Sequence, residues 1–141
     1  MQNINLYKQP NQWICLFATP WRGELSTIES HILHHPNGQV YLGRASGFGT
    51  PYQVMMRRYY HHNKWRALGF GKPTLDKYAF GVSGRYAIRG REQQLIDFYG
   101  GIGSPKVANL IRGVSRYNVA GRGFHQLSNS YFGNIAPYTG F

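Results

Sequence analysis

Acidic residues are scarce in this chain. Of its 141 residues, 16 are Lys or Arg and only five are Asp or Glu, so the formal net charge at pH 7 is +11. A field of this sign attracts polyanions and speeds encounter with them, although an acidic protein or a membrane surface would respond to the same charge. The basic residues are spread along the chain rather than gathered in one tail, which favours a charged groove and a nucleic-acid partner.

Sulfur and long apolar runs are scarce as well. The single cysteine, Cys15, excludes an internal disulfide, and its place in the apolar run 13–17 predicts a buried structural thiol. No apolar run approaches the roughly 18 residues that indicate a transmembrane helix. The N-terminus lacks the basic and apolar regions of a signal peptide, so we expect a protein made in the cytoplasm without a cleavable leader.

The chain has no internal repeat, no low-complexity tract and no clear domain boundary, and 141 residues suit one domain. An apolar fraction of 42% is enough to bury a modest core without disulfides. We expect an N-terminal arm over residues 1–25, a core over 26–114 and an irregular C-terminal wrap over 115–141, which its aromatic side chains hold in place.

Turn and cap residues predict the order of the elements. Asn37-Gly38 between β-prone runs predicts a hairpin with strands near 27–35 and 39–44. Thr50-Pro51 predicts an N-cap and a first-turn proline. The helices expected from these patterns are 51–63, 90–99 and 104 to 111 or 114, with a loop over 64–73. A third strand is expected at 78–82 or 85–89, and 74–80 is either a short helix or extended.

Tyr41 is the first candidate for chemistry. Side chains alternate on a strand, so Tyr41 and Gly43 share one face while Val40 and Leu42 suit the core. Gly43 would leave room beside the phenol, which could act as a general base if nearby cations lowered its pKa. The alternative is an ordinary strand tyrosine.

Two Arg-His pairs follow on the predicted helix 51–63. Arg57 lies four residues before His61, and Arg58 lies four before His62, so each pair shares a helix face. An arginine there would hold a phosphate and oppose the charge of a transition state. Only one pair can face the Tyr41 cavity fully, and the sequence does not decide which; the other would form a solvated basic face.

Glu92 is a carboxylate among arginines. A lone carboxylate suits Mg²⁺ (or Mn²⁺), which keeps most of its waters and takes other oxygens from phosphate. The alternative is a structural acid stabilised by the N-terminal dipole of the predicted helix 90–99. The histidines have no Cys, His or carboxylate spacing that would complete a zinc site.

Other polar residues are predicted to contact nucleic acid through phosphates. They are Arg44, Lys64, Arg89, Arg91, Asn109 and Arg112. Asn109, on the predicted helix 104–111, could instead orient Glu92.

The order of these motifs resembles the GIY-YIG nuclease superfamily. Val40-Tyr41-Leu42-Gly43 is similar to its second signature tripeptide, and Arg57 or Arg58 with His61 or His62 is similar to its helical arginine and histidine. Arg91-Glu92 resembles the start of the helix that presents its metal-binding glutamate, and Asn109 stands near its downstream asparagine. The resemblance, over residues 27–112, implies an α+β fold with a small three-stranded antiparallel sheet flanked by helices. It also implies single-metal hydrolysis of a nucleic-acid phosphodiester. Our hypothesis is a Mg²⁺-dependent nuclease, with DNA favoured over RNA as its substrate.

The first tripeptide of that family is missing, because the strand that should carry it has no tyrosine. His31 or Ser30 is expected to fill its place.

The segment from 90 to 141 is also similar to C-terminal toxin modules of bacterial polymorphic toxins (Rhs or contact-dependent types). That resemblance implies delivery into a target cell as part of a larger toxin, and an acidic immunity protein in the producer. Two alternatives stay open: a metal-independent ribonuclease that uses His and Arg, and a non-catalytic nucleic-acid-binding module.

Overall fold

The computed structural model describes residues 7–8, 11–12 and 26–141; the prediction for Cys15 lies outside them. Strands β1 (Tyr7–Lys8) and β2 (Asn11–Gln12) form a two-residue antiparallel pair. The rest of the described chain builds one three-stranded sheet and its helices.

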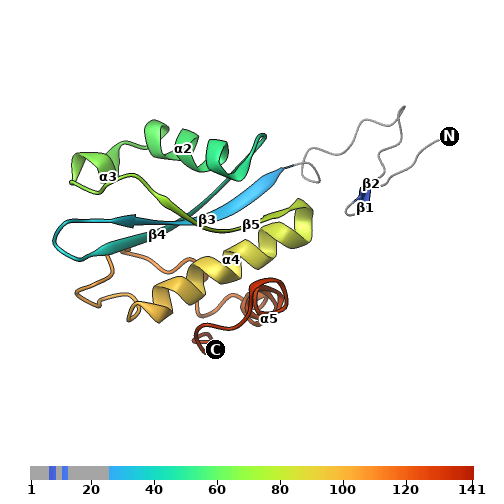
Figure 1. Ribbon diagram of the computed structural model, residues 1–141. Helices are drawn as coiled ribbons and strands as arrows, with labels where there is room; N and C mark the ends of the chain where they lie inside the picture. The colour runs from blue at the N-terminus through green and yellow to red at the C-terminus, as the bar shows by residue number, and fades with distance from the viewer. Residues whose placement is uncertain (1–6, 9–10, 13–25) are drawn as a thin grey trace.

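The sheet contains β3 (Thr27–His34), β4 (Val40–Gly47) and β5 (Thr74–Phe80), in the order β4-β3-β5 and antiparallel throughout. Helices α2 (Pro51–His61) and α3 (Lys64–Ala67) lie on one side of it, and α4 (Gly81–Phe98) lies on the other (Figure 1). Helix α5 (Gly121–Phe132) packs against α4. The predicted α+β class with a three-stranded antiparallel sheet flanked by helices is therefore confirmed.

Local sequence accounts for the hairpin and for the start of α2. Gly38 adopts φ 92° in the turn between β3 and β4, a conformation that favours glycine. Thr50 caps α2: its hydroxyl accepts from the Gln53 amide at 3.2 Å, and the Gln53 side chain accepts from the Thr50 amide at 2.9 Å. The predicted loop 64–73 contains the single turn α3.

The prediction of a helix beginning at Gly90 is wrong, because α4 begins at Gly81 and also includes the residues expected as a strand at 85–89. The third strand is β5, so the extended alternative for 74–80 is confirmed, and the strand expected at 78–82 overlaps it over residues 78–80. Gly90 lies inside α4 because α5 approaches closely there: a Cβ on Gly90 would lie 2.1 Å from the carbonyl oxygen of Phe124. This glycine therefore serves helix packing rather than helix initiation.

The helix expected over 104–111 is also wrong. This segment runs along the outer edge of β4, where Val40 donates to the Lys106 carbonyl and accepts from the Ala108 amide, both at 2.8 Å. Asn109 continues the pairing with its side chain, accepting from the Leu42 amide at 2.9 Å and donating to the Leu42 carbonyl at 2.8 Å. The edge backbone groups of Val40 and Leu42 are thus hydrogen-bonded. A helix over 104–111 would not bond them, because most of its backbone groups would bond to one another.

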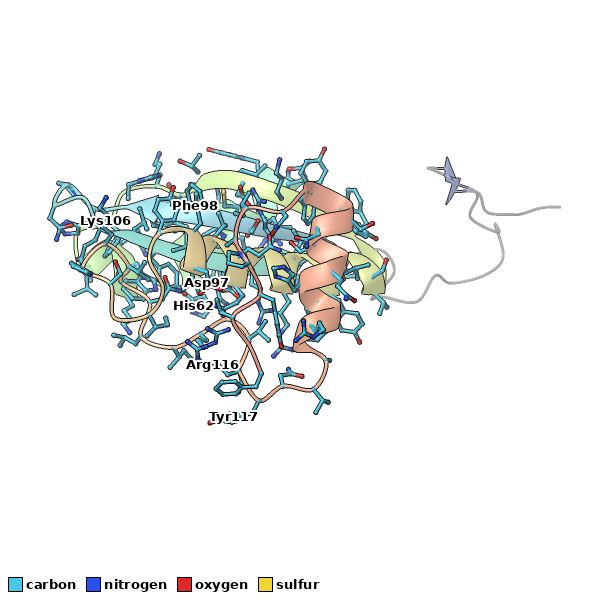
Figure 2. The ribbon with its side chains drawn as sticks, turned by 90° about the horizontal axis from the view of Figure 1, so that it is seen from below. His62, Asp97, Phe98, Lys106, Arg116 and Tyr117 are labelled. Atoms are coloured by element: carbon cyan, nitrogen blue, oxygen red, sulfur yellow. The ribbon has the colours of Figure 1, made fainter. Side chains whose placement is uncertain are left out.

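The C-terminal wrap is partly regular, because α5 occupies much of the segment expected to be irregular. Beyond α5, the Thr139 hydroxyl donates to Asp97 at 2.7 Å and accepts from Arg112 at 2.9 Å. In Figure 2 the segment that carries Arg116 and Tyr117 lies on the same side of the molecule as Asp97 of α4. Polar contacts as well as aromatic side chains therefore hold the wrap in place.

The two faces of the sheet differ in character. Toward α4, Val40 and Leu42 join Leu95 and Ile96 in an apolar core, as the strand alternation predicted. Toward α2, the central strand β3 presents Glu29 and His31, which are 0% and 4% exposed. Burial of such groups is costly unless they are paired, and Glu29 and His31 are paired with each other. None of the helices in the described residues is long and apolar enough to cross a bilayer.

A buried ion pair ties β5 to α4. Arg91 donates to Asp76 through Nε at 2.8 Å and Nη2 at 3.0 Å, and the two side chains are 8% and 12% exposed. Truncating Asp76 to Ala would leave the guanidinium buried and unpaired, so we expect the free energy of unfolding to fall by about 3 kcal/mol. Urea denaturation measures this loss; a change below about 0.5 kcal/mol would contradict the structural role given to the pair.

Candidate active site

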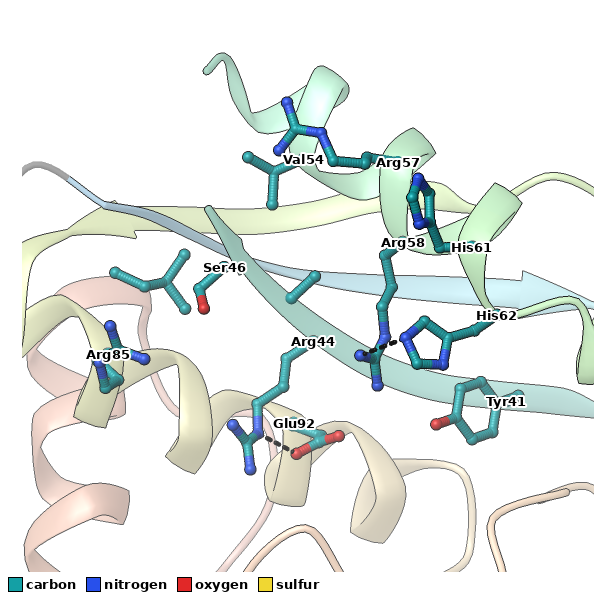
Figure 3. Close-up of a pocket in the computed structure, with 12 residues that line it drawn as sticks. Tyr41, Arg44, Ser46, Val54, Arg57, Arg58, His61, His62, Arg85 and Glu92 are labelled. Carbon is teal, nitrogen blue, oxygen red and sulfur yellow. Dashed lines mark hydrogen bonds and ion pairs between the residues drawn. The ribbon is translucent and has the colours of Figure 1, made fainter. Parts of the chain in front are cut away.

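A pocket of about 430 Å³ opens at the outer edge of β4, between α2 and α4 (Figure 3). Its position follows from the fold, because the segment 106–109 covers the edge of β4 only as far as Leu42, and residues 44–46 line the pocket. The charged and imidazole side chains of its wall are Arg44, Arg57, Arg58, His61, His62, Arg85 and Glu92. Four arginines against one carboxylate among these lining residues give the pocket a positive field, which attracts anions.

Glu92 is the acidic group of the pocket. It lies in the middle of α4 rather than near a helix N-terminus, so the dipole does not explain it. Its Oε2 accepts from Arg44 Nε at 2.7 Å, and the residue is 8% exposed. Burial raises the pKa of Glu92, and the neighbouring Arg44 opposes that rise.

Tyr41 lines the pocket from β4, and its ring stacks on Trp65 with centroids 4.1 Å apart. Burial raises the pKa of the Tyr41 hydroxyl, and the nearby Glu92 raises it further, while Arg58 opposes them. The condition for a tyrosine base, a pKa lowered by cations, is therefore not met. A protonated phenol can still donate to a phosphate oxygen or orient water.

The two Arg-His pairs take different places. Arg58 Nη1 lies 3.1 Å from His62 Nε2, and both side chains also line an inner cavity of about 110 Å³ with Tyr41 and His31. Arg57 donates to the Phe48 carbonyl at 3.1 Å and, with His61, lines only the larger pocket. Arg58 and His62 are therefore the inner pair, and Arg57 and His61 form the rim.

Glu29 is the residue that the sequence analysis missed. Both of its carboxylate oxygens lie 2.9 Å from His31 Nδ1, and no part of Glu29 is exposed. Burial raises its pKa, whereas the hydrogen bond and the charge of His31 lower it. The register of the predicted hairpin could have identified Glu29. In that register Glu29 and His31 share one face of the sheet with Tyr41 and Gly43.

The residues predicted to contact nucleic acid divide into two groups. Arg91, Asn109 and Arg112 have internal partners: Asp76, the Leu42 backbone, and the Val114 carbonyl with Thr139. The side chain of Asn109 bonds to Leu42 rather than to Glu92. Arg44 lines the main pocket. Lys64 stands 4.8 Å from the Trp65 ring, and Arg89 stands 5.2 Å from the Phe124 ring.

The donor set of the pocket limits the metal that it could hold. The described residues contain no group of three or more His, Cys, Asp or Glu side chains placed to bind a metal ion. One carboxylate on an open, polar pocket fits Mg²⁺ or Mn²⁺, which retain waters and accept phosphate oxygens, and it does not fit zinc. Glu92 would hold the ion after its bond to Arg44 opens.

Comparisons with family models, curated proteins and solved structures found no match to this chain.

Proposed function

We propose that this protein is an endonuclease that hydrolyses phosphodiesters of nucleic acid with Mg²⁺ or Mn²⁺, with DNA favoured over RNA. The observation that carries the proposal is one pocket that combines Tyr41 from β4, Arg58 from α2 and Glu92 from α4. These three side chains are far apart in the sequence, and none of them belongs to the apolar core clusters. Their order on a hairpin, helix, strand and helix also supports the resemblance to the GIY-YIG superfamily.

Each side chain has a role in that reaction. The guanidinium of Arg58 would bind the scissile phosphate and oppose the charge that develops in the transition state. The Tyr41 hydroxyl would donate to a phosphate oxygen or orient the attacking water. A divalent cation held by Glu92 would polarise the phosphate and stabilise the leaving oxygen. Arg57 and Arg85, at the rim, would bind flanking phosphates.

The biological setting that we propose is an antibacterial toxin module. The net charge of +11 supports both a nucleic-acid substrate and inhibition by an acidic immunity protein. In this proposal the module is part of a larger secreted toxin and acts in the cytoplasm of the target cell.

A second candidate is a metal-independent ribonuclease. It is favoured by the inner cavity, where two imidazoles, His31 and His62, lie beside Arg58. Two imidazoles and a cation can transfer protons and stabilise a phosphorane during attack by a 2′-hydroxyl.

The test is cleavage of plasmid DNA and of structured RNA, each with Mg²⁺ or with EDTA. We expect DNA cleavage that EDTA abolishes. Replacement of Arg58 by Ala should lower kcat about 100-fold, because one oriented donor to the transition state is lost. The matched variant Arg57→Ala, one residue along the same helix, should mainly raise KM.

Three outcomes separate the candidates. RNA cleavage that persists in EDTA would identify the metal-independent ribonuclease. Salt-dependent binding without cleavage of either substrate would identify a binding module. Equal losses of kcat in the two arginine variants would contradict the assignment of inner and rim pairs.

A further inference from the structure

The layer between α2 and the sheet holds a carboxylate and an imidazole that the proposed roles leave unused. Glu29 is completely buried, and its two oxygens both lie 2.9 Å from Nδ1 of His31, which is 4% exposed. Positions that face a covering helix from a central strand are usually apolar. A buried charged pair there is not needed for stability, since an apolar pair of similar volume would serve as well.

The other ring nitrogen of His31 is turned toward the site. A Cβ built on Gly43 of β4 would lie 2.5 Å from His31 Nε2 and 3.1 Å from the Tyr41 ring, so the imidazole extends over Gly43 toward Tyr41. His31 also lines the inner cavity with Tyr41, Arg58 and His62. Its Nδ1 is thus occupied by Glu29, while Nε2 lies beside Gly43 at the inner cavity that Tyr41 and Arg58 also line.

The hydrogen bond to Glu29 selects the tautomer. An ionised Glu29, as its pairing with His31 implies, can only accept, so in that state Nδ1 carries the proton and Nε2 keeps its lone pair. An imidazole held this way is fixed in orientation, and the buried carboxylate stabilises the imidazolium that forms when Nε2 gains a proton. The titratable and charged groups around His31 are Glu29 from β3, Tyr41 from β4, Arg58 and Tyr59 from α2, His62 at the C-terminal cap of α2, and Lys64 from α3. Glu92 of α4 interacts with His31 through its charge.

We propose that His31 Nε2 is the base that accepts the proton of the attacking water, and that Glu29 is the residue that positions it. The inference rests on the proposed function. The water oxygen forms a bond to phosphorus, its proton moves to Nε2, the bond from phosphorus to the leaving oxygen breaks, and that oxygen takes a proton from solvent. His31 thereby supplies the proton acceptor that the protonated Tyr41 cannot supply, from the strand where the first signature tyrosine is missing.

The kinetic test compares His31→Ala, Glu29→Gln and the double variant on plasmid DNA with Mg²⁺. Loss of the base should lower kcat about 1,000-fold, and loss of the positioning charge about 100-fold, with KM within twofold of the wild type. The double variant should be no slower than His31→Ala, because Glu29 acts through His31. Added imidazole should restore part of the activity of His31→Gly and none of that of Glu92→Gln.

The second test is NMR of the ¹⁵N-labelled imidazoles in the protein without metal or substrate. We expect His31 to be protonated at Nδ1 in the wild type, and a mixture of tautomers in Glu29→Gln. A neutral His31 protonated at Nε2, or kcat of His31→Ala within twofold of the wild type, would overturn the inference. A wild type that cleaves nothing would contradict the proposed function, while the NMR result would still decide whether Glu29 orients His31.

Discussion

Replacement of Glu92 by Gln is expected to abolish DNA cleavage, with a loss of at least about 1,000-fold in kcat. Among the residues that the structure describes, Glu92 is the one carboxylate in the pocket, so no other described side chain there can supply the anionic oxygen that a hard cation requires. Loss of the several kcal/mol that a bound cation contributes to the transition state corresponds to a loss of this size. Cleavage of plasmid DNA under single-turnover conditions measures it.

A loss of folded protein should not account for the lower kcat of Glu92→Gln. Because burial raises the pKa of Glu92, the folded environment disfavours the charged carboxylate, and a neutral amide of the same shape carries no such penalty. We therefore expect thermal unfolding and DNA binding at low salt to match the wild type.

The matched control for Glu92→Gln is Asp97→Asn, the same change on the same helix. Asp97 lies outside the pocket, where it accepts from Thr139 and Gln93. This variant should lose stability and keep its cleavage rate per folded molecule. Wild-type cleavage by Glu92→Gln would exclude this pocket as the active centre.

The fold could be predicted from sequence where a short motif favours a single local structure. The Asn37-Gly38 turn and the Thr50 cap each satisfy the backbone within a few residues, so the hairpin and the start of α2 follow from sequence. Gly90 shows the opposite case. A glycine can start a helix or let another helix approach, and only the position of α5 decides between the two.

Some residues of the candidate site could likewise be recognised from the sequence, and others depend on the tertiary structure. Tyr41 and Glu92 could be chosen from the sequence because each is unusual in its own segment of the chain, whereas Arg58 could be chosen only together with Arg57. Glu29 is unremarkable in sequence, and its importance depends on a register that places it behind His31 and beneath α2. Asn109 and Arg91 were predicted to contact nucleic acid because their side chains can bind phosphate. In the structure they bind the Leu42 backbone and Asp76, and these tertiary contacts could not be read from the sequence.

A single methyl group at Gly43 should test the geometry of the site. The sequence suggests that this glycine leaves room beside Tyr41, and the structure shows that His31 lies there, with Nε2 2.5 Å from the place of a Cβ. Gly43→Ala must therefore move the imidazole away, while Glu29 holds it from the other side. We expect kcat to fall about 1,000-fold, as for loss of a general base.

The control for Gly43→Ala is Gly123→Ala in α5, where a Cβ would have no neighbour within 4 Å. Strain at Gly43 should cost about 1–3 kcal/mol in the free energy of unfolding, and the rate is therefore compared per folded molecule. In a variant that already lacks the imidazole, His31→Ala, the added methyl group should cause little further loss of activity. Full activity of Gly43→Ala, or an undiminished effect of the methyl group without His31, would show that hydrolysis does not depend on the position of the imidazole.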